Sequence, residues 1–254
     1  MKRIALIGVT GIDWFTSENK RQFIQRITPA GYEILNMHAR YGTHSVESHA
    51  DEAYNAPYIL EQVVVANSQS VDAIVIDCAC DPILDAAREV SEVPVVGVRN
   101  CALHVALMLG RRFSIVTVQG QSLVKCMEEG VRKEGLHPFC ASVRVLDIPV
   151  LKIAQEPQRV RRELVRVVRE ARDRDGADVV VLGCTGLSHE VDVESVAQET
   201  GVPVIDPLIV AVKMAALLVD TGLRHSRVAY PSPPKKPISE APDLKGVFDG
   251  VLRQ

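Results

Sequence analysis

The sequence has little that would suit it to nucleic acids or membranes. Aromatic residues make up only 4% of the 254 residues, too few for a surface on which bases stack. The formal net charge is −3 and Lys and Arg are spread along the chain, so no basic surface for a phosphate backbone is expected. No apolar stretch reaches the length of about 18 residues that a membrane span requires. We therefore expect a small-molecule ligand, with no nucleic acid and no membrane as partner.

Signals for secretion and for the common cofactor sites are also missing. The apolar run that starts at Ile4 is too short for a secretory signal and no small-residue cleavage site follows it. We expect a cytoplasmic protein whose six cysteines are free thiols. The sequence has no Gly-x-Gly-x-x-Gly after its first predicted strand, no P-loop and no Gly-x-Ser-x-Gly elbow. Nucleotide binding and serine hydrolysis thus have no positive support.

What the sequence does contain is a regular alternation of short apolar runs and helical patterns. Strands are predicted at 4–9, 32–37, 73–77, 94–98, 113–118, 143–146, 179–182 and 203–205. Helices are predicted at 16–27, 54–67, 81–90, 102–109, 122–133, 157–172, 191–199 and 208–219. This order predicts an α/β fold with parallel sheets that are covered by helices on both faces.

Three blocks of sequence occur twice, in the same order and at nearly the same spacing, which indicates an internal repeat. The matching pairs are 3–11 with 112–120, 71–78 with 177–184, and 93–96 with 202–205. The repeat predicts two similar Rossmann-like lobes related by a pseudo-two-fold, with the active site in the cleft between them.

The repeat also suggests how the chain is divided. We expect residues 1–98 together with 207–225 to form the first lobe, and residues 99–206 to form the second. Residues 226–254, with five prolines between Pro231 and Pro242, are expected to form a Pro-rich C-terminal tail. Such a tail could wrap a neighbouring surface or a partner subunit, or it could be a mobile extension.

Two cysteines occupy equivalent positions in the two halves. Cys78 and Cys184 each follow a buried strand directly and precede a helix. Ligands of open α/β sheets bind at the carboxyl ends of strands, so a two-fold relation would bring both thiols to one ligand from opposite sides. A single cysteine beside a strand is most often a core residue. The matched placement favours catalysis for this pair.

Two facing thiols suit proton transfer at a stereocentre. Inversion needs a base on one face of the carbon and an acid on the other, and a thiol with a pKa near ~8.5 can act as either. Backbone N–H groups in the turns at Ala79 and Cys80, and at Thr185 and Gly186, could stabilise the negative charge that develops on the substrate. No cofactor is expected if a carbonyl group already activates the C–H bond.

Other polar residues near the strand ends are candidates for binding the substrate. Thr10 and Gln119 occupy equivalent places after the first strand of each half, and Thr117 lies just before Gln119. Turn or cap chemistry would explain these residues equally well. Asp81 is expected to cap the helix that it begins. His189 is expected to cap the next helix or to face solvent, with an effect on Cys184 as the alternative.

The remaining cysteines lack repeat partners or a recognisable metal pattern. Cys101, Cys126 and Cys140 are expected to be structural. Cys80 forms a Cys-x-Cys pair with Cys78, but no spacing in the sequence completes the usual four-ligand zinc site, so we expect no metal site. Cys80 corresponds to Gly186 in the repeat, which suggests a packing or modulating position.

The blocks around the two cysteines are specific enough to suggest a family. The first reads Cys-Ala-Cys-Asp-Pro at 78–82, followed by Leu-Asp-Ala-Ala-Arg-Glu at 84–89, and the second reads Gly-Cys-Thr-Gly-Leu at 183–187. Both resemble the aspartate/glutamate/hydantoin racemase superfamily, above all its hydantoin racemase branch. The resemblance covers roughly residues 3–222. It implies two Rossmann-like lobes, a cofactor-free two-base mechanism with Cys78 and Cys184 as the bases, and a homo-oligomer.

The leading hypothesis is therefore a racemase or epimerase that acts on a 5-substituted hydantoin or a related amino-acid derivative. One alternative is a maleate-type cis-trans isomerase of the same superfamily, in which one cysteine is a nucleophile. Another is a two-lobed sensor of small molecules that carries out no reaction, and ligand binding without turnover would distinguish it.

Overall fold

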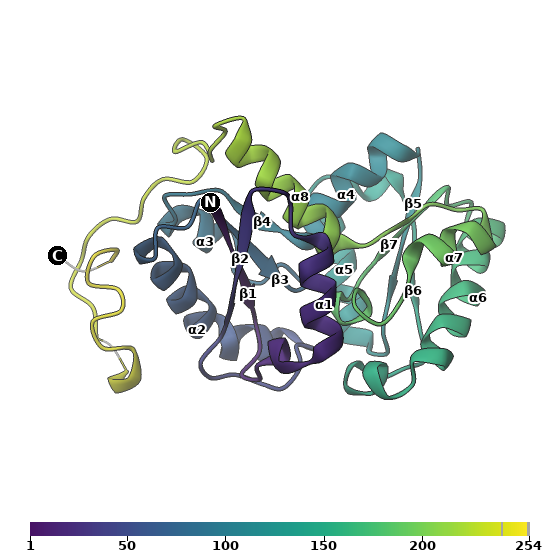
Figure 1. Ribbon diagram of the computed structural model, residues 1–254, viewed down its shortest axis with the longest axis horizontal. Helices are drawn as coiled ribbons and strands as arrows, with labels where there is room; N and C mark the ends of the chain where they lie inside the picture. The colour runs from purple at the N-terminus through teal and green to yellow at the C-terminus, as the bar shows by residue number, and fades with distance from the viewer. Residues whose placement is uncertain (240, 253–254) are drawn as a thin grey trace.

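Two parallel four-stranded sheets form the framework of the computed structural model, which describes residues 1–239 and 241–252 (Figure 1). The first sheet has the order β2-β1-β3-β4 and the second the order β6-β5-β7-β8. The strands are β1 (Lys2–Gly8), β2 (Tyr32–His38), β3 (Ala73–Asp77), β4 (Val95–Gly97), β5 (Phe113–Thr117), β6 (Cys140–Val145), β7 (Val179–Leu182) and β8 (Val204–Ile205). The two sheets have the same order of strands, and the predicted pair of Rossmann-like lobes is confirmed.

Helices lie on both faces of each sheet, as Figure 1 shows. They are α1 (Glu18–Ile27), α2 (His49–Ser68), α3 (Leu84–Val90), α4 (Val98–Leu109), α5 (Gln121–Lys133), α6 (Pro157–Asp175), α7 (Val193–Thr200) and α8 (Pro207–Asp220). Every residue of the central strands β3 and β7 is buried. Burial on both faces explains why these strands read as continuous apolar runs instead of alternating patterns.

The structure corrects the predicted start of three helices, of which α4 begins at Val98 instead of residue 102. Helix α2 begins at His49 instead of residue 54, because the Ser48 side chain accepts a hydrogen bond from the Asp51 N–H and caps the helix. Helix α3 begins at Leu84 instead of residue 81, because Asp81 and Ile83 have left-handed backbone angles, with φ of 49° and 53°. The segment between Cys78 and α3 is therefore a turn.

The prediction that Asp81 caps its own helix is wrong. Its carboxylate accepts the backbone N–H groups of Arg99, at 3.2 Å, and Asn100, at 2.6 Å, so it caps α4 instead. Gly97 permits this approach, because a Cβ at that position would lie 2.7 Å from the Asp81 carboxyl. The turn that follows Cys78 is thereby held against the first residues of α4.

Helix α4 joins the two lobes. It packs against β3 and β4 of the first sheet and against β5 and β7 of the second. Helix α8 packs against α4 and against β1, β3 and β4. The contacts of α8 are compatible with placing residues 207–225 in the first lobe, and the division of the chain into lobes and tail stays a prediction.

The segment after α8 runs over the first lobe of the same chain (Figure 1). The Arg227 guanidinium donates hydrogen bonds to the carbonyl oxygens of Arg88, Glu89 and Ser91, and Arg88 donates to the Tyr230 hydroxyl at 3.0 Å. Only residues Pro242–Leu244 of this segment form a helical turn within the described range. No helix in the described residues is long and apolar enough to cross a membrane.

Candidate functional site

A cavity of about 130 Å³ lies between the two lobes, at the carboxyl ends of β1, β3 and β7. Its polar and sulfur-bearing lining residues are Thr10, Trp14, Lys20, His44, Ser45, Asp77, Cys78, Cys80, Cys184, Thr185 and His189. Much of the remaining wall is aliphatic and comes from the loops after β1 and β2 and from the segment 150–154. This is the edge of the sheets at which α/β proteins bind small molecules.

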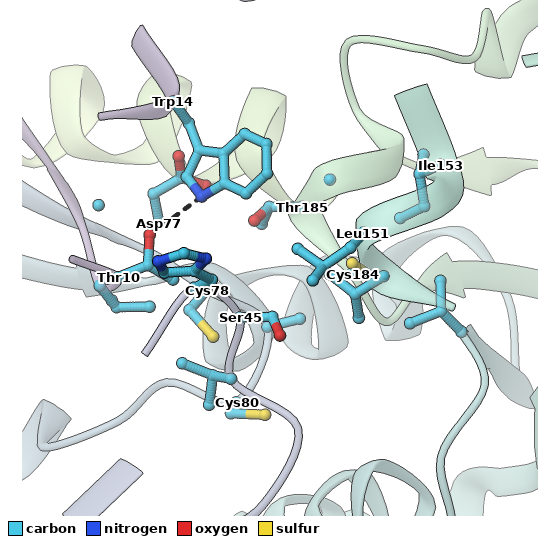
Figure 2. Close-up of a pocket in the computed structure, with 18 of the residues that line it drawn as sticks. Thr10, Trp14, Ser45, Asp77, Cys78, Cys80, Leu151, Ile153, Cys184 and Thr185 are labelled. Carbon is cyan, nitrogen blue, oxygen red and sulfur yellow. Dashed lines mark hydrogen bonds between the residues drawn. The ribbon is translucent and has the colours of Figure 1, made fainter. Parts of the chain in front are cut away.

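The two predicted cysteines lie on opposite sides of this cavity, as Figure 2 shows. Cys78 directly follows β3 and Cys184 follows β7 after one glycine, so the equivalent strands of the two sheets position them. Both are partly exposed free thiols, whereas Cys80, Cys101 and Cys126 are buried. The strand ends thus bring the two thiols to the same small volume from different lobes.

A tight turn surrounds Cys184. Cys184 is followed by a 3-10 turn, Thr185–Leu187, and the next α-helix does not begin directly after it. Burial raises the pKa of Cys184 to about 12, although the backbone N–H groups of Gly186 and Leu187 hydrogen-bond its sulfur and act in the opposite direction. Cys184 is consequently a thiol at neutral pH, and two donors stand ready for the thiolate that it would become after giving up its proton.

Asp206 supports this turn from the start of α8. The Ser188 hydroxyl donates to the Asp206 carboxylate at 2.8 Å, and the same oxygen accepts the N–H groups of Leu208 and Ile209. Asp206 therefore caps the beginning of α8. Burial raises the pKa of Asp206 to about 6. The turn after Cys184 is thus fixed to the start of α8, which packs against β1, β3 and β4 of the first sheet.

The predicted substrate-binding residues fall into two groups. Ala79, Thr185 and Gly186 line the cavity, and so does Thr10, whose hydroxyl accepts the indole N–H of Trp14 at 3.0 Å. Thr117 is completely buried and donates to the Gly183 carbonyl at 3.1 Å, away from the cavity lining. Gln119 is exposed and donates to the Asp147 carboxylate at 3.2 Å. In these positions Thr117 supports the backbone before Cys184, and Gln119 is part of a surface loop.

Sequence reasoning missed the loop after β2, which supplies His44, Ser45 and Val46 to the cavity. The buried side chain of Asn55 holds this loop beside the one after β1. Its amide donates to the Val9 carbonyl at 3.0 Å and its oxygen accepts the Thr43 N–H at 2.9 Å. The signal that could have found the loop is its place after a parallel strand, because all such loops meet at one edge of the sheet.

A buried ion pair lies beside Cys78. Lys20 of α1 and Asp77, the last residue of β3, are 2.6 Å apart, and their side chains are 6% and 2% exposed. His189 also lines the cavity, so the expectation that it caps the next helix or faces solvent is wrong. Asp192 caps α7 instead. Burial, with the nearby Lys20 charge, lowers the pKa of His189 to about 4, so this imidazole is neutral near pH 7.

The neutral His189 should make the fold sensitive to acid. Protonation is disfavoured in the folded state, so the free energy of unfolding should fall as the pH decreases from about 6.5 toward 4. In His189→Gln this contribution is absent. Between pH 7 and pH 5 the variant should lose about 2 kcal/mol less stability than wild type. Urea unfolding of both proteins at the two pH values measures the difference, and parallel losses would contradict the assignment.

Comparison with known proteins agrees with this architecture. The sequence pattern of the Asp/Glu/Hydantoin racemase family matches residues 4–215. A hydantoin racemase of Rhizobium meliloti is 43% identical over 190 residues, which cover 74% of this chain and 78% of that protein.

Two solved structures have the same fold. The allantoin racemase of Klebsiella pneumoniae is 34% identical, with a TM-score of 0.84 over 97% of this chain and 99% of the other. The allantoin racemase of Pseudomonas fluorescens is 30% identical, with a TM-score of 0.85 over 93% of this chain and 100% of the other. The chain therefore belongs to the Asp/Glu/Hydantoin racemase family and is an isomerase of the racemase type.

Proposed function

We propose that the chain racemises 5-substituted hydantoins by proton transfer between Cys78 and Cys184, without a cofactor. The observation that carries the proposal is the placement of two partly exposed thiols on opposite sides of one cavity, at equivalent strand ends of the two sheets. The hydantoin and allantoin racemases to which the chain is similar support the substrate class, because allantoin is itself a 5-substituted hydantoin.

The chemistry requires one thiolate and one thiol. The thiolate removes the proton from C5 of the hydantoin ring, and the electron pair of that bond moves into the enolate of the neighbouring carbonyl. The opposite thiol then protonates C5 from the other face, which inverts the carbon and exchanges the roles of the two sulfurs. Cys184, a thiol at neutral pH, is the acid in one direction, and the Gly186 N–H favours the thiolate that results.

The wall of the cavity indicates which substituent it would accept. Trp14, Leu151 and Ile153 present apolar surface (Figure 2), Val46 also lines the cavity, and few charged groups do. An alkyl or aryl group at C5 would bury its surface there favourably. The ureido group of allantoin would exchange its hydrogen bonds to water for bonds to a few side chains such as His44 and Ser45, and would gain less from the apolar wall. We infer a preference for apolar 5-substituents.

Proton NMR in deuterated buffer tests the activity and this preference together. Single enantiomers of 5-benzylhydantoin, 5-isopropylhydantoin, allantoin and free amino acids would be incubated with enzyme and, as control, without it. We expect deuterium to enter C5 together with loss of optical purity, at least about tenfold faster for the apolar hydantoins than for allantoin. Exchange confined to amino acids, or binding without any exchange, would overturn the proposal and favour another racemase substrate or a sensor.

The compartment and the assembly of the enzyme are part of the same proposal. The six cysteines are free thiols, which fits the cytoplasmic location expected from the sequence. We also expect a homo-oligomer, and light scattering of the purified protein would measure its mass.

A further inference from the structure

Three potential metal ligands converge behind Cys78, outside the pair of cysteines discussed above. They are Glu52 of α2, Cys80 of the turn after β3, and Cys126 of α5, and their ligand atoms all lie within 4.8 Å of one another. The two cysteines are buried. Three separate elements of the chain supply the group, so no spacing rule in the sequence could have found it. It is the one group of this kind found in the described residues.

The spacing of the atoms suits a small tetrahedral ion. The Cys126 sulfur and a Glu52 carboxylate oxygen are 3.4 Å apart. A zinc ion with a Zn–S bond of about 2.3 Å and a Zn–O bond of about 2.0 Å places its sulfur and oxygen ligands about 3.5 Å apart. The Cys80 thiol hydrogen-bonds to Cys126 and lies within the same group. Small side-chain movements would therefore bring all three atoms to bonding distance.

The surrounding charges also suit a bound divalent cation. Two thiolates, one carboxylate and Zn²⁺ together carry one negative charge. The Arg99 guanidinium, which is buried, places Nη1 3.8 Å from the Cys126 sulfur and also forms an ion pair with Asp81 at 3.9 Å, so its charge is shared between Asp81 and the proposed site. Gly130 of α5 allows this approach, because a Cβ there would lie 2.2 Å from the Arg99 Cζ. Arg99 Nε has no hydrogen-bond partner within the described part of the chain.

We propose that Glu52, Cys80 and Cys126 bind one Zn²⁺ ion through two thiolate sulfurs and a carboxylate oxygen. Binding releases the two thiol protons to solvent, and no electron transfer is involved. A second cavity, lined by all three ligands and by His49 and Glu129, gives the ion a route of entry and leaves space for a water molecule as fourth ligand. Cys80 also lines the cavity that contains Cys78, so the metal site adjoins the racemase site.

Titration of the reduced, metal-free full-length protein with Co²⁺ tests the proposal, because cobalt reports tetrahedral geometry and thiolate ligation in its absorption spectrum. We expect one equivalent to bind with thiolate-to-metal charge-transfer bands, and Zn²⁺ to displace it. Cys126→Ser should weaken binding by more than about 100-fold, and Glu52→Gln should weaken it by at least about tenfold. Cys101→Ser, which changes a buried thiol outside the group, is the matched control.

The catalytic thiols could themselves hold a metal ion, so a second variant separates the two sites. The double variant Cys78→Ser/Cys184→Ser should still bind one Co²⁺ with the wild-type spectrum. Loss of binding in that double variant, or unchanged binding in Cys126→Ser with circular dichroism showing a folded protein, would overturn the proposal. The absorption readout is independent of racemase activity, so failure of the metal site would leave the proposed function standing.

Discussion

Cys184→Ser should lower the rate of hydantoin racemisation by at least about 1000-fold, and so should Cys78→Ser. A serine hydroxyl occupies nearly the same space as a thiol but is a much weaker acid, so it can neither exist as the base at neutral pH nor donate its proton readily. The measurement is the loss of optical rotation of a single enantiomer, corrected for the rate without enzyme. Cys101→Ser, which changes a buried thiol away from the cavity, should racemise at the wild-type rate.

The two variants should also differ in the substrate enantiomer whose C5 hydrogen they exchange with deuterium from the solvent. In Cys184→Ser the remaining base is Cys78, so deuterium should enter only the enantiomer whose C5–H bond points toward that side of the cavity. In Cys78→Ser the other enantiomer should exchange, and more slowly, because Cys184 is a thiol at neutral pH. Exchange of the same enantiomer by both variants would argue against two bases on opposite faces. A covalent adduct on one cysteine, seen by mass spectrometry, would favour the nucleophilic isomerase instead.

Lys20→Met should lower the free energy of unfolding by about 3–5 kcal/mol. The change leaves the Asp77 carboxylate buried without its cation, and an uncompensated buried charge is costly. Urea unfolding at pH 7 measures the effect. The double variant Lys20→Met/Asp77→Asn removes both charges and should recover at least half of the loss. A single variant that unfolds within about 1 kcal/mol of wild type would show that the pair is not an isolated buried ion pair.

Most of the fold could be predicted from the sequence because the apolar runs that mark the strands are short, local patterns and occur again in the second half of the chain. The buried strands β3 and β7 are unbroken apolar runs with matching sequence around them, and each cysteine follows its strand at once or after one glycine. The start of α3 could not be predicted, because the turn before it has left-handed backbone at Asp81 and Ile83 and is held by hydrogen bonds from Asp81 to α4.

The site was predictable only where one strand end determined the position of a side chain. Cys78 and Cys184 meet that condition. Trp14, Ser45 and His189 do not, since their positions depend on loops held by distant partners such as Asn55. Gln119 occupies the place in the second half that Thr10 has in the first, but its side chain is exposed and contacts Asp147. Equivalence in the repeat was therefore not enough to predict a cavity residue.

The position of Asp81 has a consequence for the geometry of catalysis. Asp81 fastens the turn after Cys78 to the beginning of α4, and α4 packs against β7, the strand that leads to Cys184. The segments that carry both sulfurs therefore contact the same helix. In the proposed mechanism the hydantoin ring lies between the two sulfurs, so the contacts of α4 would govern the fit of the ring, while the loops and the segment 150–154 would govern the group at C5.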